Sequence, residues 1–115
     1  MRRPVCRKAD AELCNQFKLK RWIRNADRRA IYFKLCFDSW TTLAEIASQD
    51  EPSQQAMLGF IALALDDDPS FDTFVRKRDR STMLSKRDAW DDLQRACAAM
   101  VLDEYLDAID NGGWQ

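Results

Sequence analysis

The sequence predicts an all-α protein, and its composition and hydrophobic periodicity both indicate this class. The chain of 115 residues contains only three glycines and three prolines, and two of the glycines are adjacent near the carboxyl end. Since sheets need more turn residues than this, we expect helices throughout. Hydrophobic residues make up 46% of the chain, which is enough apolar surface for one domain over residues 1–115.

The first helix is expected to run from about Asp10, a residue type that often caps helices, to about Asn25. A repeat of 3.6 residues per turn places one set of apolar residues on a single face, which should be the core face. These residues are Leu19, Trp22, Ile23 and Ala26.

Phe17 points to the opposite side of this predicted helix, into a basic face that includes Lys20, Arg21 and Arg24. Two interpretations remain open. Phe17 packs against another element, as apolar residues commonly do, or it is an exposed aromatic anchor surrounded by cations, which are residue types enriched in binding hot spots. The exposure of Phe17 distinguishes the two.

A second helix is expected from Arg28 to about Phe37, capped by Asp27. Its segment IYFKLCF is apolar nearly all round, which is typical of a helix at the centre of a core. A short third helix over residues 42–49 begins with a capping box, in which Thr42 and Glu45 satisfy backbone amides.

Three further helices complete the predicted fold. The fourth runs from about Ser53 to Leu65 with Pro52 at its start, and the fifth from Phe71 to about Lys77. Between them, residues 66–68 are three aspartates, which we expect to form a solvated turn. The last helix follows a cap at Ser85 and ends at about Asp110, a length of roughly 38 Å that makes it the spine of the fold.

The sequence therefore predicts a compact bundle of five or six helices around the carboxyl-terminal helix. Trp114, close to the end, either docks on this bundle or stays free for a partner. The expected core residues are Tyr32, Phe33, Leu35, Phe37, Trp40, Phe60, Ile61, Trp90, Leu93 and Met100.

The net charge of −1 hides a strong segregation of charge along the chain. Residues 1–37 contain 11 Lys and Arg against 3 Asp and Glu, whereas residues 38–75 contain 8 acidic residues and no basic one. Residues 76–87 are basic again, and residues 88–115 contain 7 acidic residues against Arg95. Either helices of opposite charge neutralise each other, or one pole stays open and attracts a charged partner.

Several functional classes are disfavoured by residues that the chain lacks. Without histidine, the usual nucleophile and base pairs and the common zinc sites are missing, and no phosphate-binding glycine loop occurs. We therefore expect neither catalysis nor a metal or cofactor. The four cysteines form no CxxC pair and are expected to be free thiols in a cytoplasmic protein. The longest apolar run, Met57–Leu65, has 9 residues, fewer than a membrane span needs.

Residues 42–60, TLAEIASQDEPSQQAMLGF, contain the small residue Ala47 with the apolar Ile46 beside it. Ser53 then opens a second helix, on which Met57 and Phe60 are expected to point inward. This pattern resembles the helix-turn-helix family, which implies DNA bases read by the second helix, here through Gln54 and Gln55. The sequence departs from the family at Glu51 and Pro52, where the turn normally has glycine and an apolar residue. The second helix also contains no Lys or Arg to meet the charge of DNA.

By elimination, the leading hypothesis is a non-catalytic module that binds a protein or protein complex and covers its surface. By analogy, it is a stoichiometric inhibitor or adaptor of the kind that phages and mobile elements encode. The expected contact residues are Phe17, Lys20, Arg21, Arg24, Arg76 and Arg78. The alternative is a nucleic-acid-binding protein that uses the basic first helix, the segment 76–80 and Arg2, Arg3, Gln54 and Gln55.

Overall fold

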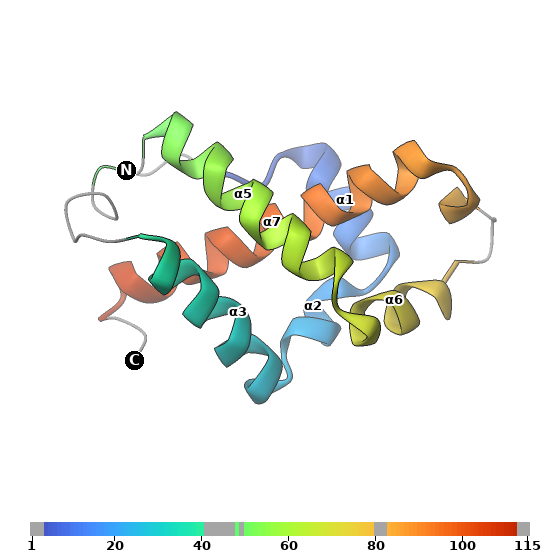
Figure 1. Ribbon diagram of the computed structural model, residues 1–115, viewed down its shortest axis with the longest axis horizontal. Helices are drawn as coiled ribbons and strands as arrows, with labels where there is room; N and C mark the ends of the chain where they lie inside the picture. Colours follow the sequence, from blue (N-terminus) through green and yellow to red (C-terminus); the bar gives the residue numbers. More distant parts are fainter. Residues whose placement is uncertain (1–3, 41–47, 49, 80–82, 113–115) are drawn as a thin grey trace.

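The computed structural model describes residues 4–40, 48, 50–79 and 83–112, and this part of the chain is helical without a strand (Figure 1). It confirms the predicted all-α bundle with a long carboxyl-terminal helix. Six α-helices and one short 3₁₀ helix form in the described part: α1 (Lys8–Gln16), α2 (Leu19–Ile23), α3 (Ala26–Ser39), α5 (Glu51–Asp66), α6 (Pro69–Arg76), η1 (Met83–Ser85) and α7 (Arg87–Asp110).

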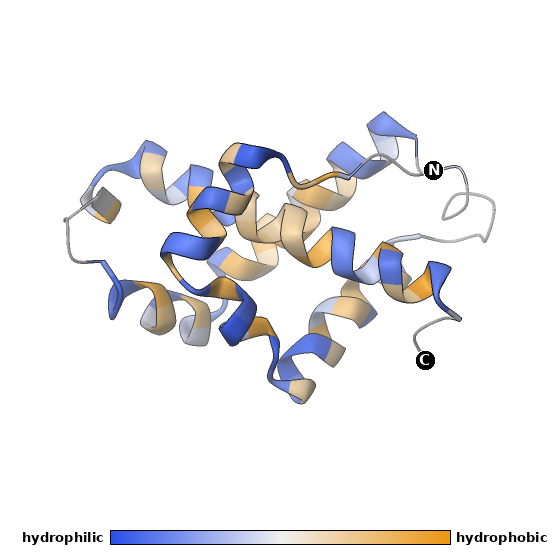
Figure 2. Cartoon of the chain, turned by 180° about the vertical axis from the view of Figure 1, so that it is seen from behind, coloured by the Kyte–Doolittle hydropathy of each residue, from blue (hydrophilic) through white to orange (hydrophobic). Residues whose placement is uncertain are grey.

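Helix α7 is the central element, and α1, α3 and α5 pack around it (Figure 1). Four consecutive residues in its middle, Ala96–Ala99, are buried. Because successive residues of an α-helix point about 100° apart, burial of all four means that other elements enclose α7 on every side. Figure 2 shows hydrophobic residues concentrated where the helices meet and hydrophilic residues on the outer turns.

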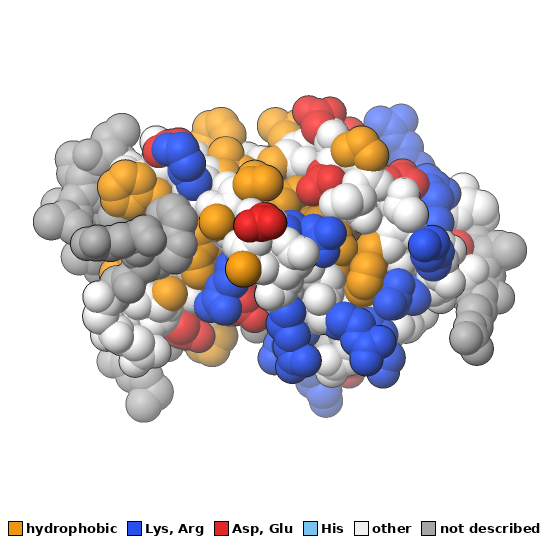
Figure 3. All heavy atoms as spheres, turned by 90° about the horizontal axis from the view of Figure 1, so that it is seen from below, with side chains coloured by type: hydrophobic (Ala, Val, Ile, Leu, Met, Phe, Trp, Pro, Cys, Tyr) orange, Lys and Arg blue, Asp and Glu red, His pale blue; other side chains and the backbone are white. Residues whose placement is uncertain are grey.

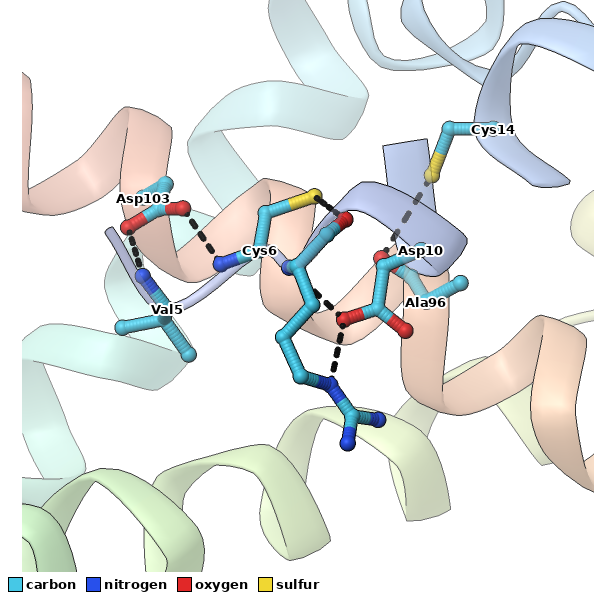
Figure 4. A network of polar contacts seen from close by, with 7 residues as sticks. Val5, Cys6, Asp10, Cys14, Ala96 and Asp103 are labelled. Atoms are coloured by element: carbon cyan, nitrogen blue, oxygen red, sulfur yellow. Dashed lines mark hydrogen bonds and ion pairs between the residues drawn. The ribbon is translucent and has the colours of Figure 1, made fainter. Parts of the chain in front are cut away.

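The segment before α1 is tied to α7 by a carboxylate (Figure 4). Asp103 on α7 accepts hydrogen bonds from the backbone amides of Val5 at 2.9 Å and Cys6 at 2.7 Å. Helix α1 then begins at Lys8, and Asp10 in its first turn accepts from the amide of Arg7 at 2.9 Å. Asp10 therefore caps the helix from inside its first turn, and the predicted start at Asp10 is wrong by two residues.

The predicted first helix is in fact two helices, because the chain breaks after Phe17. Lys18 has a φ of 58°, in the left-handed region that stops an α-helix. The amide of Lys18 donates to the carbonyl of Asn15, and α2 starts at the next residue, Leu19. The break changes the direction of the chain, so that Phe17 and Leu19 are both buried in the core.

The starts of α3, α5 and α6 are set by side chains that cap the first turn. Asn25 accepts from the amide of Arg28, Asp50 from that of Ser53, and Asp68 from that of Ser70. Capping residues of this type satisfy amides that have no partner inside the helix. The predicted cap of α3 at Asp27 is therefore wrong.

Several smaller expectations for these segments are also decided by the structure. Pro52 lies in the first turn of α5, as predicted, and Pro69 has the same place in α6. The capping residue of α7 is Lys86 and not Ser85. The predicted helix over residues 42–49, apart from residue 48, lies outside the described residues, as do Arg2, Arg3 and Trp114.

The turn of three aspartates is more than a solvated loop. Asp68 accepts a hydrogen bond from the hydroxyl of Tyr32 at 2.9 Å, and Asp66 accepts from the side-chain amide of Gln94 at 2.8 Å. The two bonds join the end of α5 and the start of α6 to α3 and α7. The expectation that these carboxylates serve only solvation is corrected accordingly.

Most of the predicted core is confirmed, and two of its members are wrong. The buried members are Tyr32, Phe33, Trp40, Ile61, Leu93 and Met100, while Leu35 and Trp90 are half-buried. The side chains of Phe37 and Phe60 are 54% and 53% exposed. The reason is that α3 and α5 lie against α7 with one face each, so that apolar residues on their outer faces stay at the surface.

The outer face of α5 carries a glycine that the fold does not require. Gly59 lies in the middle of the helix, is exposed, and has no atom within 4 Å of the position where a Cβ would stand. Because glycine in a helix interior is less favourable than alanine, Gly59→Ala should raise the free energy of unfolding by about 0.5–1 kcal/mol. Urea denaturation followed by circular dichroism measures this, and a lower midpoint would contradict it.

Candidate interaction surface

Two basic segments that are far apart in the sequence meet on one face of the protein. The ring of Trp22 on α2 packs edge to face on Phe71 of α6, with 5.2 Å between the centroids. This contact places Arg28, which lies over the ring of Trp22, beside Lys77 and Arg78 after α6. Figure 3 shows Lys and Arg side chains gathered in the lower central and right part of this face. We call the surface formed by Arg28, Lys77 and Arg78 beside Trp22 the basic face.

A pocket of about 520 Å³ lies on the basic face between α2, the start of α3 and α6. Three of its side chains are cations, and no lining residue is acidic. Aromatic, hydroxyl and proline side chains complete the wall. The lining residues are Trp22, Arg28, Pro69, Ser70, Thr73, Phe74, Lys77 and Arg78.

Aromatic rings hold the two guanidinium groups of the pocket. Arg28 lies over the ring of Trp22 at 4.6 Å, and Arg78 lies over Phe74 at 3.6 Å. Each also donates one hydrogen bond to the backbone carbonyl of the same aromatic residue. Because a guanidinium has five N–H donors, most donors remain available, and the stacking reduces the freedom lost when a ligand binds.

The indole of Trp22 also lines the pocket. Its Nε1 atom is buried and has no hydrogen-bond partner in the described part of the chain. Buried polar groups normally have a partner, but this N–H is covered by protein atoms and is not open to a ligand in the pocket.

Phe17 does not belong to the surface. Its side chain is 1% exposed and packs in the core beyond the end of α1. The interpretation as an exposed anchor is therefore wrong, and the packing interpretation holds. The physical reason is the break at Lys18, because it changes the direction in which the Phe17 side chain points relative to α2.

The other residues predicted for the contact divide into separate groups. Lys20, Arg21 and Arg24 are exposed on or just after α2, and Arg78 lines the pocket. Arg76 instead forms an ion pair with Asp72 at 2.7 Å and lies over the ring of Trp90, away from the pocket.

Of the lining residues, the sequence predicted only Arg78, as a contact residue, and Lys77, within the basic segment 76–80. The six that it missed are Trp22, Arg28, Pro69, Ser70, Thr73 and Phe74. Arg28 was predicted only as the first residue of a helix, and Trp22 only as a core residue. No local pattern relates them to α6, because the pocket exists only after α2 and α6 have packed together.

The cations near the carboxyl-terminal half of α7 are partly neutralised by a carboxylate. Burial raises the pKa of Glu104, while Arg29, Lys20 and Arg24 act in the opposite direction without cancelling the effect of burial. The expectation that basic and acidic helices neighbour one another therefore applies on this side. The pocket side, in contrast, has cations without a facing acid in its lining.

Glu104→Gln is expected to raise the thermal midpoint at pH 7. The raised pKa means that the folded state favours the protonated form of Glu104. Protonation therefore stabilises the fold. This stabilisation is complete below the unfolded-state pKa of 4.5 and is lost as pH rises through the higher folded-state pKa. Glutamine remains neutral, so the difference from the wild type should disappear towards pH 4. Calorimetry at both pH values, with exposed Glu12→Gln as control, measures this, and a lower midpoint at pH 7 would contradict it.

A second, smaller cavity of about 260 Å³ lies between α1 and α7 and is lined partly by Cys6 and Cys14. All four cysteines are free thiols, as predicted. Burial raises the pKa of Cys14 and of Cys36 to about 12 and also raises that of Cys97. Since the thiolate is the reactive form, these groups are poor nucleophiles. In the described ranges no cluster of three metal-ligating side chains occurs.

The segment that resembles a helix-turn-helix unit is described only in its second half. Helix α5 buries Met57 as expected, but Phe60 is exposed. Gln54 is half-buried and Gln55 is exposed, and no cation stands beside them on the helix. Contact of these glutamines with nucleic acid remains a prediction.

Comparisons with models of protein families, with characterised proteins and with solved structures find no significant match. Among the helices of the described ranges, none combines the length and the apolar character needed to cross a membrane.

Proposed function

We propose that the chain is a non-catalytic interaction module that binds an acidic surface of a protein partner through its basic face. By covering that surface it acts in the cytoplasm as a stoichiometric inhibitor or an adaptor. The observation that carries this proposal is the convergence of Arg28 on α3 with Lys77 and Arg78 after α6 around a pocket with aromatic walls and no acidic lining residue.

The composition of this surface supports protein recognition. Arginine and aromatic residues dominate binding hot spots because they offer a large contact area together with directed hydrogen bonds. Here Arg28 and Arg78 are already stacked on Trp22 and Phe74, so less side-chain freedom is lost on binding. The open cations would also increase the association rate with an acidic partner.

The test is affinity purification from extracts of the native cell with nuclease and several salt concentrations, followed by titration of the purified partner. The double variant Lys77→Glu/Arg78→Glu should weaken binding by about tenfold or more, which corresponds to about 1.4 kcal/mol. The matched control is Lys86→Glu/Arg87→Glu, since these two neighbouring cations are exposed at the start of α7. Equal losses in both variants would contradict the assigned surface.

Nucleic acid is the alternative ligand, and the gathering of open cations on one face is the observation that favours it. Binding of this kind would drop steeply between low and physiological salt, because each phosphate contact releases a counterion. A gel shift of generic duplex at low salt that disappears in Lys77→Glu/Arg78→Glu would support the alternative. It would then replace the protein partner in our proposal.

A further inference from the structure

The pocket on the basic face gathers positive charge that the described part of the chain does not neutralise. Arg28, Lys77 and Arg78 line it, and within the described ranges none of the three forms an ion pair. Like charges around one concavity repel each other, and a bound anion removes this repulsion. A bound anion would therefore stabilise this arrangement of cations.

The three cations of the pocket offer hydrogen-bond donors to an oxyanion. The guanidinium groups of Arg28 and Arg78 lie over aromatic rings and have further N–H donors. Lys77 contributes an ammonium group. Thr73, whose side chain carries a hydroxyl, lines the same pocket. The oxygen atoms of an anion can satisfy several of these donors together.

Charge and size decide which oxyanion fits best. A carboxylate carries one negative charge, whereas a phosphate monoester carries about −1.5 to −2 and three acceptor oxygens at neutral pH. Three cations match the larger charge. The volume of about 520 Å³ and the rings of Trp22 and Phe74 also leave room for the group that carries the phosphate.

We propose that this pocket binds a phosphate monoester, carried on a phosphorylated side chain of the protein partner. The inference rests on the proposed function, because it places the phosphoryl group on the surface that the basic face covers. A partner would then be recognised in its phosphorylated form and released after dephosphorylation.

The first experiment uses small probes, with no partner present. N-acetyl phosphotyrosine amide, N-acetyl phosphoserine amide, inorganic phosphate and N-acetyl glutamate amide are titrated at constant ionic strength into the ¹⁵N-labelled protein. The readout is the indole N–H resonance of Trp22, assigned through Trp22→Phe. We expect the phosphorylated amides to shift it and glutamate to bind at least about tenfold more weakly.

Variants show whether the shift comes from this pocket. Lys77→Gln is informative because Lys77 is exposed and no hydrogen bond or ion pair of its side chain is found in the described ranges, so that folding should be preserved. It should weaken phosphate monoester binding by about fivefold to tenfold. The control Lys86→Gln, also exposed, should leave the affinity unchanged. No shift with either phosphorylated amide, or equal binding of glutamate, would overturn the inference.

Inorganic phosphate that binds as tightly as the phosphorylated amides would indicate a site for free phosphate and would overturn the assignment to a side chain. With the purified partner in hand, phosphatase treatment separates the two proposals. Binding that stays sensitive to Lys77→Glu/Arg78→Glu but is unaffected by phosphatase would refute the phosphate inference and leave the proposed function standing. Binding insensitive to both would refute both.

Discussion

Phe17→Ala is expected to lower the free energy of unfolding by about 3–5 kcal/mol, the usual range for removing a fully buried phenylalanine. The side chain is 1% exposed, and α1 and α2 meet at this residue. The change would leave a cavity where the two helices join. Urea denaturation at neutral pH, followed by circular dichroism, measures the loss.

The matched control for this prediction is Arg21→Ala, a change on the exposed face of α2. Surface changes of this kind usually alter stability by less than about 0.5 kcal/mol. If Phe17→Ala unfolded at the same urea concentration as the wild type and lost only partner binding, the anchor interpretation would be restored and the packing of α1 on α2 would be wrong.

The facing of Phe17 was wrongly predicted because the break between α1 and α2 has no sequence signal. Chain reversals of this type normally use glycine or asparagine, since other residues are strained in the left-handed region. Here a lysine adopts it, at a φ of 58°. The sequence therefore predicted one continuous helix through residue 18. The direction of each side chain before the break was then derived from the axis of a helix that does not exist.

The parts of the fold that follow from local rules could be predicted. Helix α7 shows a long apolar stripe and ends where expected, and Pro52 opens α5. The positions of Phe37 and Phe60 could not be predicted in the same way, because their exposure depends on which face of α3 and α5 meets α7. An apolar residue type alone does not identify the inner face.

The candidate surface was predicted only in part, for a related reason. Charge blocks along the chain indicate basic segments around α2 and after α6, and Lys77 and Arg78 follow from the second of these. That the two segments form one pocket depends on the contact between Trp22 and Phe71. Such a contact between helices that are distant in the sequence leaves no local pattern, so Arg28 could not be assigned to the same site.

Ala96→Leu is the second change for which we expect a large loss of stability, about 1–3 kcal/mol from overpacking. Ala96 is fully buried on α7, and the thiol of Cys14 on α1 donates to its backbone carbonyl at 3.4 Å (Figure 4). A leucine needs space that α1 occupies, so the two helices must separate. Thermal or urea unfolding measures the loss.

The control is Arg95→Leu, which introduces the same residue one position earlier, where the side chain is exposed. It should change stability by less than about 0.5 kcal/mol. Because α2 follows α1 after only Phe17 and Lys18, a displaced α1 should also shift Trp22 and the pocket wall. Ala96→Leu should therefore weaken phosphate monoester binding, although residue 96 lies outside the basic face. If the two variants had equal stability and equal affinity, α1 and α7 would not be tightly packed.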